Sequence, residues 1–349
     1  MTDALLRRIR PEQFREIVLF GVVIAMLIFF WTQIPDYFAP RPTNRLTLEM
    51  AIPLVVAVGQ VLVVLTRNID LSVSSMVGLT AYMVGTLLTR QPDLPPLVAV
   101  LLAIGMGVGL GAVNGLIVAY GGVPAIITTL GTLAIYRVFL VEVSDAKTVT
   151  TADLPDWLND VPSSTVATIG DFDVRMLAAV ALVVAFLGQL VLRYLPFGRR
   201  LFAIGSNPEA AISSGLPVKR DVFLAFTVCG GLSGLAGFMY LARYGNITVT
   251  AAQGLELQVV AAVVVGGVNI FGGSGSMIGA LLGVMLIETL QQSLLRWANV
   301  SEFIKDALLG LLILLAVTAD ALVLSRLRDR WIRARHRSRA EAATVNLDG

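Results

Sequence analysis

Apolar segments of membrane-crossing length follow one another along almost the whole chain, and this succession limits the fold more than any other feature. A helix needs about 20 predominantly apolar residues to cross a bilayer. Because lipid offers the backbone no hydrogen-bond partners, such segments fold as a helical bundle. We therefore expect an all-α, polytopic integral membrane protein with about ten transmembrane helices. Their expected ranges are 17–34, 46–66, 72–89, 97–119, 123–142, 176–195, 222–242, 255–270, 275–295 and 303–323.

Composition agrees with a membrane protein. Of the 349 residues, 56% are hydrophobic and 14% are charged, whereas a soluble domain has about 25% charged residues. Three expected spans, at 72–89, 123–142 and 255–270, are short or interrupted by glycine, proline or polar residues. We expect them either as full spans or as short or broken helices buried in protein. Eight crossings is the alternative if two of them are re-entrant.

Arginine and lysine set the expected orientation, because cytoplasmic loops are enriched in both. The N-terminal segment 1–16, the loop 196–221 and the C-terminal tail 324–349 are basic, whereas the loop 143–175 is acidic. We therefore expect one transmembrane domain at 17–323, with both termini and the loop 196–221 in the cytoplasm and the loop 143–175 outside. The basic tail could bind anionic lipid, although topology alone explains its charge.

The loop 196–221 contains the signals of a two-turn helix. Asn207 can cap such a helix, and Pro208 suits its first position. Glu209 complements the positive helix end, and Gly215 supplies a left-handed stop. A helix this short does not persist alone in water, so it must rest on its own bundle or on a soluble partner. The residues assigned to this coupling helix are Asn207, Pro208, Glu209, Ala210, Ala211 and Gly215.

No nucleotide, metal or catalytic site is expected in this chain. A phosphate-binding loop ends in Gly-Lys-Ser or Gly-Lys-Thr, but Lys147, Lys219 and Lys305 follow alanine, valine and isoleucine. The single histidine, His336, lies in the basic tail, and the single cysteine, Cys229, lies in an apolar span. A metal cluster and a base for a serine nucleophile are therefore both lacking. We expect a protein that is not an enzyme and holds no metal or cofactor of its own.

A few polar side chains lie in or beside the spans. A charge there costs about 2.5–3.5 kcal/mol or more and usually faces a cavity or a partner. Asp70 can cap the helix that follows it, with Ser72 as the alternative cap. The sequence supports this structural role and a role in transport equally. Uncharged polar groups join helices by default. The candidates for the translocation pathway are Asp70, Ser72, Asn114, Thr128, Thr129 and Glu288.

Five glycines and Asn269 also interrupt the apolar run 261–276. The further candidates for the pathway or a gate are Gly266, Gly267, Asn269, Gly272 and Gly273. Glycine lets one backbone approach another closely or adopt a positive φ, and irregular backbone at membrane depth lies inside protein or along a water-filled path. Two explanations stay open, a translocation path or gate and a purely structural hinge.

A different glycine pattern lies earlier in the chain. Gly107, Gly111 and Gly115 recur every four residues within an apolar span. The segment superficially matches a dinucleotide-binding fingerprint, but no strand precedes it. Close helix–helix packing along a smooth stripe is the better explanation.

Four short elements stand in order along the chain. They are Ile69–Ser75, with Ser74 where the pattern has glycine, then Pro124–Gly131, Gly198–Gly215 and Ala261–Gly275. Each is weakly specific alone, but together they resemble the permease subunits of bacterial sugar ATP-binding cassette importers of the ribose, rhamnose and autoinducer-2 type. The similarity covers about residues 46–320. The stretches Phe223–Val228 and Ala242–Gly245 are more similar to the rhamnose and autoinducer-2 branch than to the ribose branch.

The resemblance implies a multi-pass protein of the bacterial cytoplasmic membrane that works in an assembly. Two permease subunits, identical or paralogous, form the pathway, and a cytoplasmic ATPase binds ATP and Mg²⁺ and docks the coupling helix. An extracytoplasmic binding protein delivers the sugar, membrane lipid surrounds the permease, and no nucleic acid is involved. Transport is expected to follow alternating access. The spans show no dense cluster of hydrogen-bonding and aromatic groups, which suits a path that need not bind sugar tightly. The alternative is an ion-coupled secondary transporter.

Overall fold

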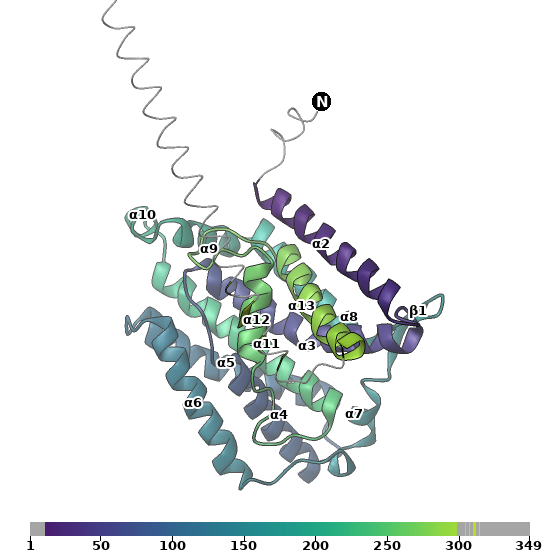
Figure 1. The fold of residues 1–349 in the computed structure, drawn as a ribbon. Helices are drawn as coiled ribbons and strands as arrows, with labels where there is room; N and C mark the ends of the chain where they lie inside the picture. The colour runs from purple at the N-terminus through teal and green to yellow at the C-terminus, as the bar shows by residue number, and fades with distance from the viewer. Residues whose placement is uncertain (1–10, 299–303, 305–306, 308–309, 312–313, 315–349) are drawn as a thin grey trace, which may run out of the picture.

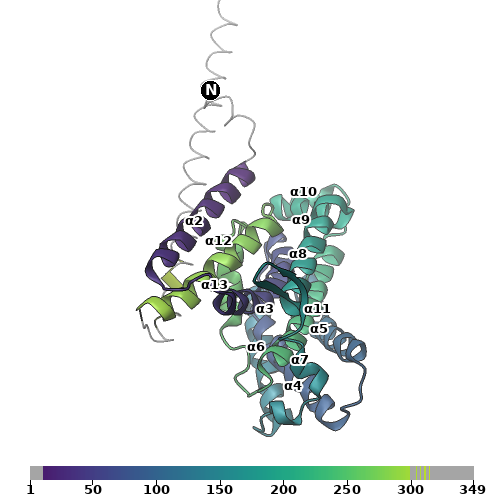
Figure 2. The same cartoon turned by 90° about the vertical axis from the view of Figure 1, so that its right-hand side faces the viewer.

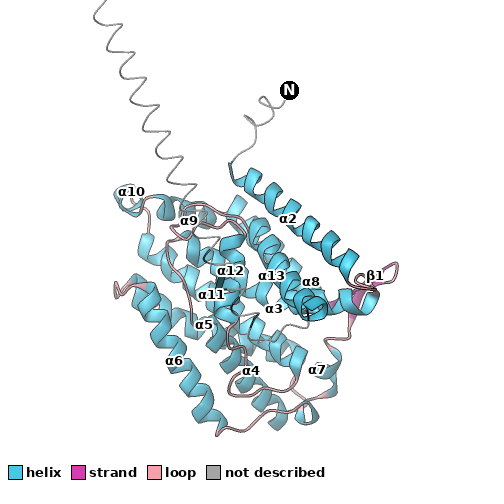
Figure 3. Cartoon of the chain, viewed as in Figure 1, coloured by secondary structure: helices cyan, strands magenta, loops and turns pink. Residues whose placement is uncertain are grey.

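The computed structural model describes residues 11–298 together with 304, 307, 310, 311 and 314. Helices joined by loops make up nearly all of this part of the chain (Figures 1 and 3). The expected span 303–323 lies largely outside the described residues, and residues 1–10 and the tail 324–349 lie wholly outside them.

Seven of the described helices are long and apolar enough to cross a membrane, by length and composition. They are α2 (Pro11–Gln33), α3 (Pro40–Leu65), α5 (Pro96–Ala119), α6 (Ala125–Ser144), α8 (Met176–Tyr194), α11 (Val218–Tyr244) and α13 (Met277–Ala298). This confirms a polytopic all-α membrane protein. The expected span 123–142 is thus a full-length helix.

The two other weak segments form shorter or more polar helices. The segment 72–89 becomes α4 (Val73–Arg90), which is largely buried and carries serine and threonine among its apolar residues. The segment 255–270 becomes α12 (Leu255–Val265), only 11 residues long, followed by turns. Such a helix is too short to cross a bilayer, so α12 takes the form of a buried half-helix.

Helix α3 lies at the centre of the bundle. It is buried along most of its length and packs against α8, α11, α12 and α13. Helix α11 joins this centre to the other half, because it also packs against α4 and α5. Helix α2 packs along α13 at the edge of the bundle (Figure 2), and most of its apolar surface stays exposed.

Close helix packing at glycine is confirmed between α5 and α11. A Cβ on Gly107 would lie 2.1 Å from the carbonyl oxygen of Gly230, and one on Gly111 would lie 2.4 Å from that of Phe226. No side chain fits at such distances, so the two backbones touch directly. Direct backbone contact at glycine also joins α13 to α12, where a Cβ on Gly283 would lie 1.9 Å from the carbonyl oxygen of Ala262.

The loops gather at two ends of the bundle (Figures 1 and 2). One end holds α9 (Pro196–Ser206) and α10 (Pro208–Ser213). The opposite end holds the 3-10 turn Thr151–Asp153, the short helix α7 (Asp156–Asp160) and an antiparallel hairpin of β1 (Thr165–Ile169) and β2 (Phe172–Arg175). The two loops with the strongest sequence character, 196–221 and 143–175, are therefore at opposite ends.

Candidate functional site

Helix α10 forms where the sequence predicts it. The side-chain oxygen of Asn207 accepts the backbone N–H of Ala210 at 3.0 Å, and Pro208 occupies the first turn. Gly215 has a φ of 75°, and its N–H donates to the carbonyl oxygen of Ile212. The left-handed residue ends the helix as expected for glycine. The expected cap, start and stop of this helix are thus all present in the structure.

The outward face of α10 differs from the set of residues expected to contact a partner. Ala211 is buried against its own chain, so its side chain seats α10 on the bundle. Glu209 and Ala210 are exposed, and Ile212 exposes 63% of its surface. The face of α10 that points away from the bundle therefore includes Glu209, Ala210 and Ile212. Ile212 was missed by the sequence analysis, although its position between Ala211 and Ser213 placed it on the expected helix.

Arg67 connects α9 to the loop that follows α3. Its Nε donates to the carbonyl oxygen of Gly205 at 2.6 Å, and one terminal nitrogen donates to that of Ser206 at 2.9 Å. These carbonyls belong to the last turn of α9, where helix carbonyl groups lack intrahelical partners and attract cations. The guanidinium therefore fixes the segment that leads into Asn207 and α10.

The glycine-rich segment packs on the same place. Gly273 donates its N–H to the carbonyl oxygen of Leu65 at 3.1 Å, and Gly272 and Gly273 have φ of 79° and 77°. A Cβ on Gly273 would lie 2.6 Å from the Ser206 hydroxyl oxygen. Asn269 stabilises the turn by accepting the N–H of Phe271 at 2.9 Å.

Of the other two candidate glycines, Gly266 follows the last residue of α12, and a Cβ on it would lie 2.4 Å from the carbonyl oxygen of Gly279. Gly267 has a φ of 88°. The segment is thus a tight turn wedged between α3, α9 and α13, and these contacts support the structural explanation for its glycines. Whether it also gates a path stays a prediction.

A buried polar cluster, here called the Asp70 cluster, joins four helices. Asp70 is fully buried, and its Oδ1 accepts the N–H of Ser72 at 2.9 Å and the Ser72 hydroxyl at 2.6 Å. Asn114 of α5 donates to the Ser72 hydroxyl oxygen at 2.8 Å and lies 3.5 Å from both Asp70 carboxylate oxygens. Tyr136 of α6 donates to the carbonyl oxygen of Leu110 at 2.9 Å and lies 3.5 Å from the Asn114 side-chain oxygen.

Gln60 of α3 completes the Asp70 cluster. With its amide oriented to suit its neighbours, it donates to the carbonyl oxygen of Asp70 and accepts the Asp70 N–H, both at 3.1 Å. A buried carboxylate is costly unless it is hydrogen-bonded, and here its donors are neutral groups of Ser72 and Asn114. Gln60 was missed by the sequence analysis, although it is the one polar side chain between Met50 and Thr66.

Two threonines of α6 lie beside the Asp70 cluster. Thr129 donates to the carbonyl oxygen of Ile69 at 3.3 Å. Thr128 is buried, and its hydroxyl has no hydrogen-bond partner among the described residues. Asp70, Ser72 and Asn114 are therefore brought together and Thr129 lies beside them, whereas the sequence marked each only as a separate pathway candidate. The geometry supports their structural role, because Asp70, Ser72 and Asn114 are completely buried.

Glu288 lies elsewhere, in a cavity of about 360 Å³ formed by the first turns of α3, the last turn of α11, the start of α12 and the second half of α13. Gln258 of α12 donates to Glu288 and lies 3.5 Å from the side-chain oxygen of Gln291. The lining polar and aromatic residues include Arg45, Glu49, Tyr240, Tyr244, Gln253, Gln258, Glu288, Gln291 and Gln292.

This cavity corrects the expectation that the chain lacks a dense group of hydrogen-bonding and aromatic side chains. The physical reason is that α3, α11, α12 and α13 each contribute only one to three such residues, and the loop before α12 adds Gln253. No local stretch is enriched in them, and only the bundle brings them together.

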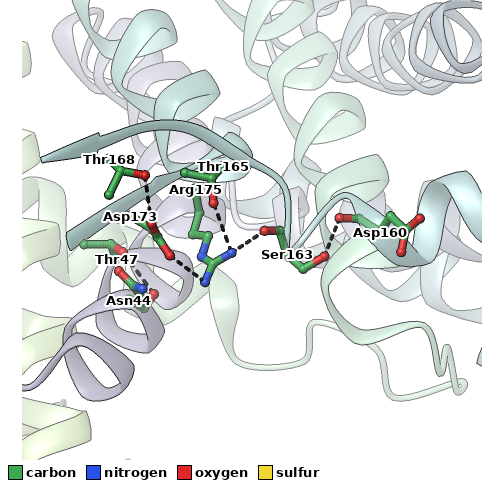
Figure 4. Close-up of polar contacts among 8 residues, drawn as sticks. All are labelled: Asn44, Thr47, Asp160, Ser163, Thr165, Thr168, Asp173 and Arg175. Carbon is green, nitrogen blue, oxygen red and sulfur yellow. Dashed lines mark hydrogen bonds and ion pairs between the residues drawn. The ribbon is translucent and has the colours of Figure 1, made fainter. Parts of the chain in front are cut away.

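The loop 143–175 holds together through its own hydrogen bonds. Figure 4 shows the guanidinium of Arg175, which contacts the Asp173 carboxylate at 3.2 Å, the Thr165 hydroxyl at 3.3 Å and the Ser163 carbonyl oxygen. Thr168 also donates to Asp173, at 3.0 Å. Strand β2 packs against the first turns of α3, where Asn44 and Thr47 lie (Figure 4). The hairpin is therefore a fixed part of this end of the bundle.

Other acids of this loop remain at the surface. Asp153, Asp156 and Asp160 are exposed. Leu158, by contrast, is fully buried, and Trp157 stacks on Phe238 of α11 with ring centroids 6.4 Å apart. The apolar residues of α7 thus attach the loop to the bundle, and its carboxylates are left to meet solvent or a partner.

Comparisons with known proteins agree with the membrane architecture. Residues 43–317 match the family described as "Branched-chain amino acid transport system / permease component". The chain is 34% identical over 306 residues to the autoinducer 2 import system permease protein LsrC of Enterobacter sp. (strain 638), covering 85% of this chain and 83% of that protein.

Similar proteins with the same name occur in other bacteria. The one from Klebsiella pneumoniae is 35% identical over 306 residues, covering 86% of each chain. The one from Photorhabdus luminescens is 34% identical over 268 residues, covering 74% of this chain and 76% of that protein.

Proposed function

The chain belongs to the family of branched-chain amino acid transport system permease components, and we propose that its solute is a monosaccharide or a related small polar compound of the autoinducer-2, rhamnose or ribose type. It is a permease subunit of an ATP-binding cassette importer. The observation that carries the proposed solute is the similarity over most of the chain to permeases named for autoinducer 2 import. That membership leaves the ion-coupled secondary transporter without support.

The partners follow from this role. We propose that two permease subunits, as two copies of this chain or as a pair with a paralogue, enclose the pathway in a bacterial cytoplasmic membrane. A separate cytoplasmic ATPase binds and hydrolyses ATP with Mg²⁺, and an extracytoplasmic binding protein delivers the solute. This chain contributes no catalytic residue. The exposed Glu209, Ala210 and Ile212 on α10 supply a surface for the ATPase, and the exposed acids of the outer loop supply one for the binding protein.

The contacts around Arg67 suggest how movement of the ATPase reaches the bundle. Displacement of α10 pulls on the end of α9, which Arg67 fastens to the loop after α3. Asp70, three residues further on, is fixed to α3, α4 and α5 by the Asp70 cluster. Helix α3 carries the displacement, and Pro53 within it, which has no N–H to donate to the preceding turn, is the point at which the helix can bend. Alternating access follows if α3 and α12 change their packing when the ATPase closes.

Reconstitution tests the proposal. Liposomes that contain this chain, its ATPase and its second permease subunit should take up radiolabelled solute only with ATP inside and the liganded binding protein outside. Uptake by this chain alone, driven by an ion gradient and without the ATPase, would overturn it.

Cysteine labelling tests the proposed orientation. Ser206 at the end of α9 and Ala152 in the 3-10 turn before α7 are both exposed, and the native Cys229 is buried. A membrane-impermeant thiol reagent on intact spheroplasts should label Ala152→Cys and leave Ser206→Cys unlabelled until the cells are opened. Labelling of both variants on intact spheroplasts would contradict the orientation.

A further inference from the structure

We propose that the cavity around Glu49 and Glu288 binds the solute in transit, and that it selects neutral polyhydroxylated compounds independently of the binding protein. This inference rests on the proposed transport function and deepens it. The cavity around Glu49 and Glu288 has a volume of about 360 Å³, which lies at the lower end of the range for small-molecule sites, about 300–1,000 Å³. A cavity of this volume suits a ligand as small as a single monosaccharide.

One wall of the cavity is held rigid by a network around Glu49. Arg243 approaches the Glu49 carboxylate at 3.2 Å, and the Tyr244 hydroxyl donates to it at 2.8 Å. The rings of Tyr240 and Tyr244 lie with their centroids 4.5 Å apart. A wall whose side chains are already fixed loses little conformational entropy when a ligand binds. Its tyrosine rings offer an apolar face with a polar tip, which matches the C–H faces and hydroxyl edges of a sugar.

The opposite wall is built from amides. Gln258, Gln291 and Gln292 line it together with Glu288. A glutamine amide both donates and accepts, and a hydroxyl group also does both, whereas a carboxylate only accepts. A lining rich in amides and carboxylates can therefore satisfy several hydroxyl groups in whichever direction they point. Few other small ligands present donors and acceptors in such equal numbers.

The charges around the cavity favour a neutral ligand. Glu49 is balanced by Arg243 and by Arg45, which lies 3.9 Å away, and Glu288 is hydrogen-bonded by Gln258. An anionic ligand would meet both carboxylates, and a cationic one would meet the guanidinium groups that already serve Glu49. Desolvating an ion without a free counter-charge is costly, so charged analogues should bind poorly.

The place of the cavity links binding to the coupling end. Glu49 and Leu65 are on the same helix, α3, about 24 Å apart along its axis at 1.5 Å per residue. Leu65 accepts the N–H of Gly273 next to the Arg67 contacts. The loop that closes the cavity beside α12 is fastened by Arg137, which donates to the carbonyl oxygens of Val249 and Ala251 at 3.1 and 2.8 Å. A shift of α3 relative to this fixed loop changes the shape of the cavity.

The first test distinguishes delivery of the solute by the binding protein from passage of the solute through the permease. In the reconstituted transporter, Gln258→Leu and Gln291→Leu should each keep the stimulation of ATP hydrolysis by liganded binding protein. Uptake of D-ribose, L-rhamnose or autoinducer 2, whichever the wild type transports, should fall about tenfold per ATP hydrolysed, which corresponds to the loss of a buried hydrogen bond. The control Gln33→Leu, an exposed glutamine outside the cavity, should change neither quantity.

Two results would overturn the proposal. One is unchanged uptake in both cavity variants. The other is loss of uptake together with loss of the ATPase or second permease subunit from the purified complex, because the cavity would then belong to an assembly surface. Failure of the wild type to show ATP-dependent uptake of any probe would instead contradict the proposed function.

A second test needs no transport. Gln292→Cys places a thiol in the cavity, and the native Cys229 is buried. Saturating D-ribose should slow modification of this thiol by a small methanethiosulfonate reagent severalfold, whereas ribonate, its carboxylate analogue, should not. Gln33→Cys should react at the same rate in all conditions. Equal rates with and without each neutral sugar, or equal protection by ribonate, would contradict a site for neutral polyhydroxylated solutes.

Discussion

Arg67 donates from Nε to the carbonyl oxygen of Gly205 across 2.6 Å, although the two residues are separated by almost 140 positions in the sequence. Arg67 does this from a backbone φ of 67°, a region that non-glycine residues seldom occupy. A side chain held in an unfavourable backbone conformation at a functional junction suggests that its guanidinium is needed there.

The first prediction concerns this residue. Arg67→Gly should relieve the backbone while removing both hydrogen bonds to α9, so the protein should fold and assemble but lose most of its coupled uptake. Arg67→Lys should also be impaired, because an ammonium is a point charge that does not reproduce the guanidinium fork. The measurement is the ratio of solute taken up to ATP hydrolysed in proteoliposomes. A wild-type ratio in both variants would show that Arg67 does not transmit movement.

The second prediction uses two glycines on the same helix. Gly107→Ala should destabilise the protein by about 1–3 kcal/mol, because the new methyl group overpacks the contact with Gly230. A Cβ on Gly105 would have no neighbouring atom within 4 Å. Gly105→Ala should therefore leave stability unchanged or raise it by up to about 1 kcal/mol, since alanine is the better helix former. Thermal unfolding in detergent measures both. Equal effects would mean that α5 and α11 are not in direct backbone contact.

The third prediction concerns the Asp70 cluster. Asn114→Ala and Ser72→Ala should each cost about 1–3 kcal/mol, because each leaves a buried carboxylate with fewer donors. Their combined cost should be smaller than the sum, since both residues serve the same carboxylate. A double-mutant cycle on thermal unfolding in detergent measures the difference. Additive costs would indicate that Asn114 and Ser72 do not share Asp70.

Much of the fold could be predicted because the bilayer sets strict conditions on length and polarity. Span positions followed from apolar runs, and α10 followed from local signals at Asn207, Pro208 and Gly215. The form of the segment 255–270 could not be fixed, because its apolar run is compatible both with a span and with a short helix; in the structure α12 ends at Val265, and Gly267 has a φ of 88°.

The site was less accessible from sequence. Asp70 and Ser72 are neighbours in the chain, but their contacts with Gln60 and Asn114 depend on how α3 and α5 are rotated. No local sequence pattern indicates the cavity around Glu288, since Glu49, Tyr244 and Gln258 come from three different helices. Polar residues within apolar spans marked single candidates, and the fold alone shows which of them meet.

The fourth prediction concerns the exposed acids of the loop 143–175, which we propose faces the binding protein. Replacing Asp153, Asp156 and Asp160 by asparagine should weaken docking of the binding protein more at low salt than at high salt, because exposed charges are screened within about 8 Å at physiological ionic strength. Asp173→Asn is a poor substitute for this test, since Asp173 pairs with Arg175 inside the hairpin. Affinity measured over a salt series decides the matter. An effect that does not depend on salt would exclude electrostatic docking at these residues.

The last prediction concerns α10. If its outward face docks into the ATPase, Ile212→Asp should abolish co-purification of the ATPase, because it places a charge in an apolar contact, and Glu209→Lys should also weaken the helix end by about 0.3–1 kcal/mol.

Gly215 offers a matched pair for the same surface. Gly215→Val should fail, since a β-branched residue tolerates a φ of 75° poorly, whereas Gly215→Asn should function, because asparagine accepts this conformation. No membrane-spanning helix is altered, so all four variants of α10 should insert normally. The measurements are ATPase pull-down from detergent extracts and solute uptake. If Ile212→Asp and Gly215→Val both retain the ATPase and full uptake, α10 is an ordinary loop helix and movement must enter the bundle elsewhere.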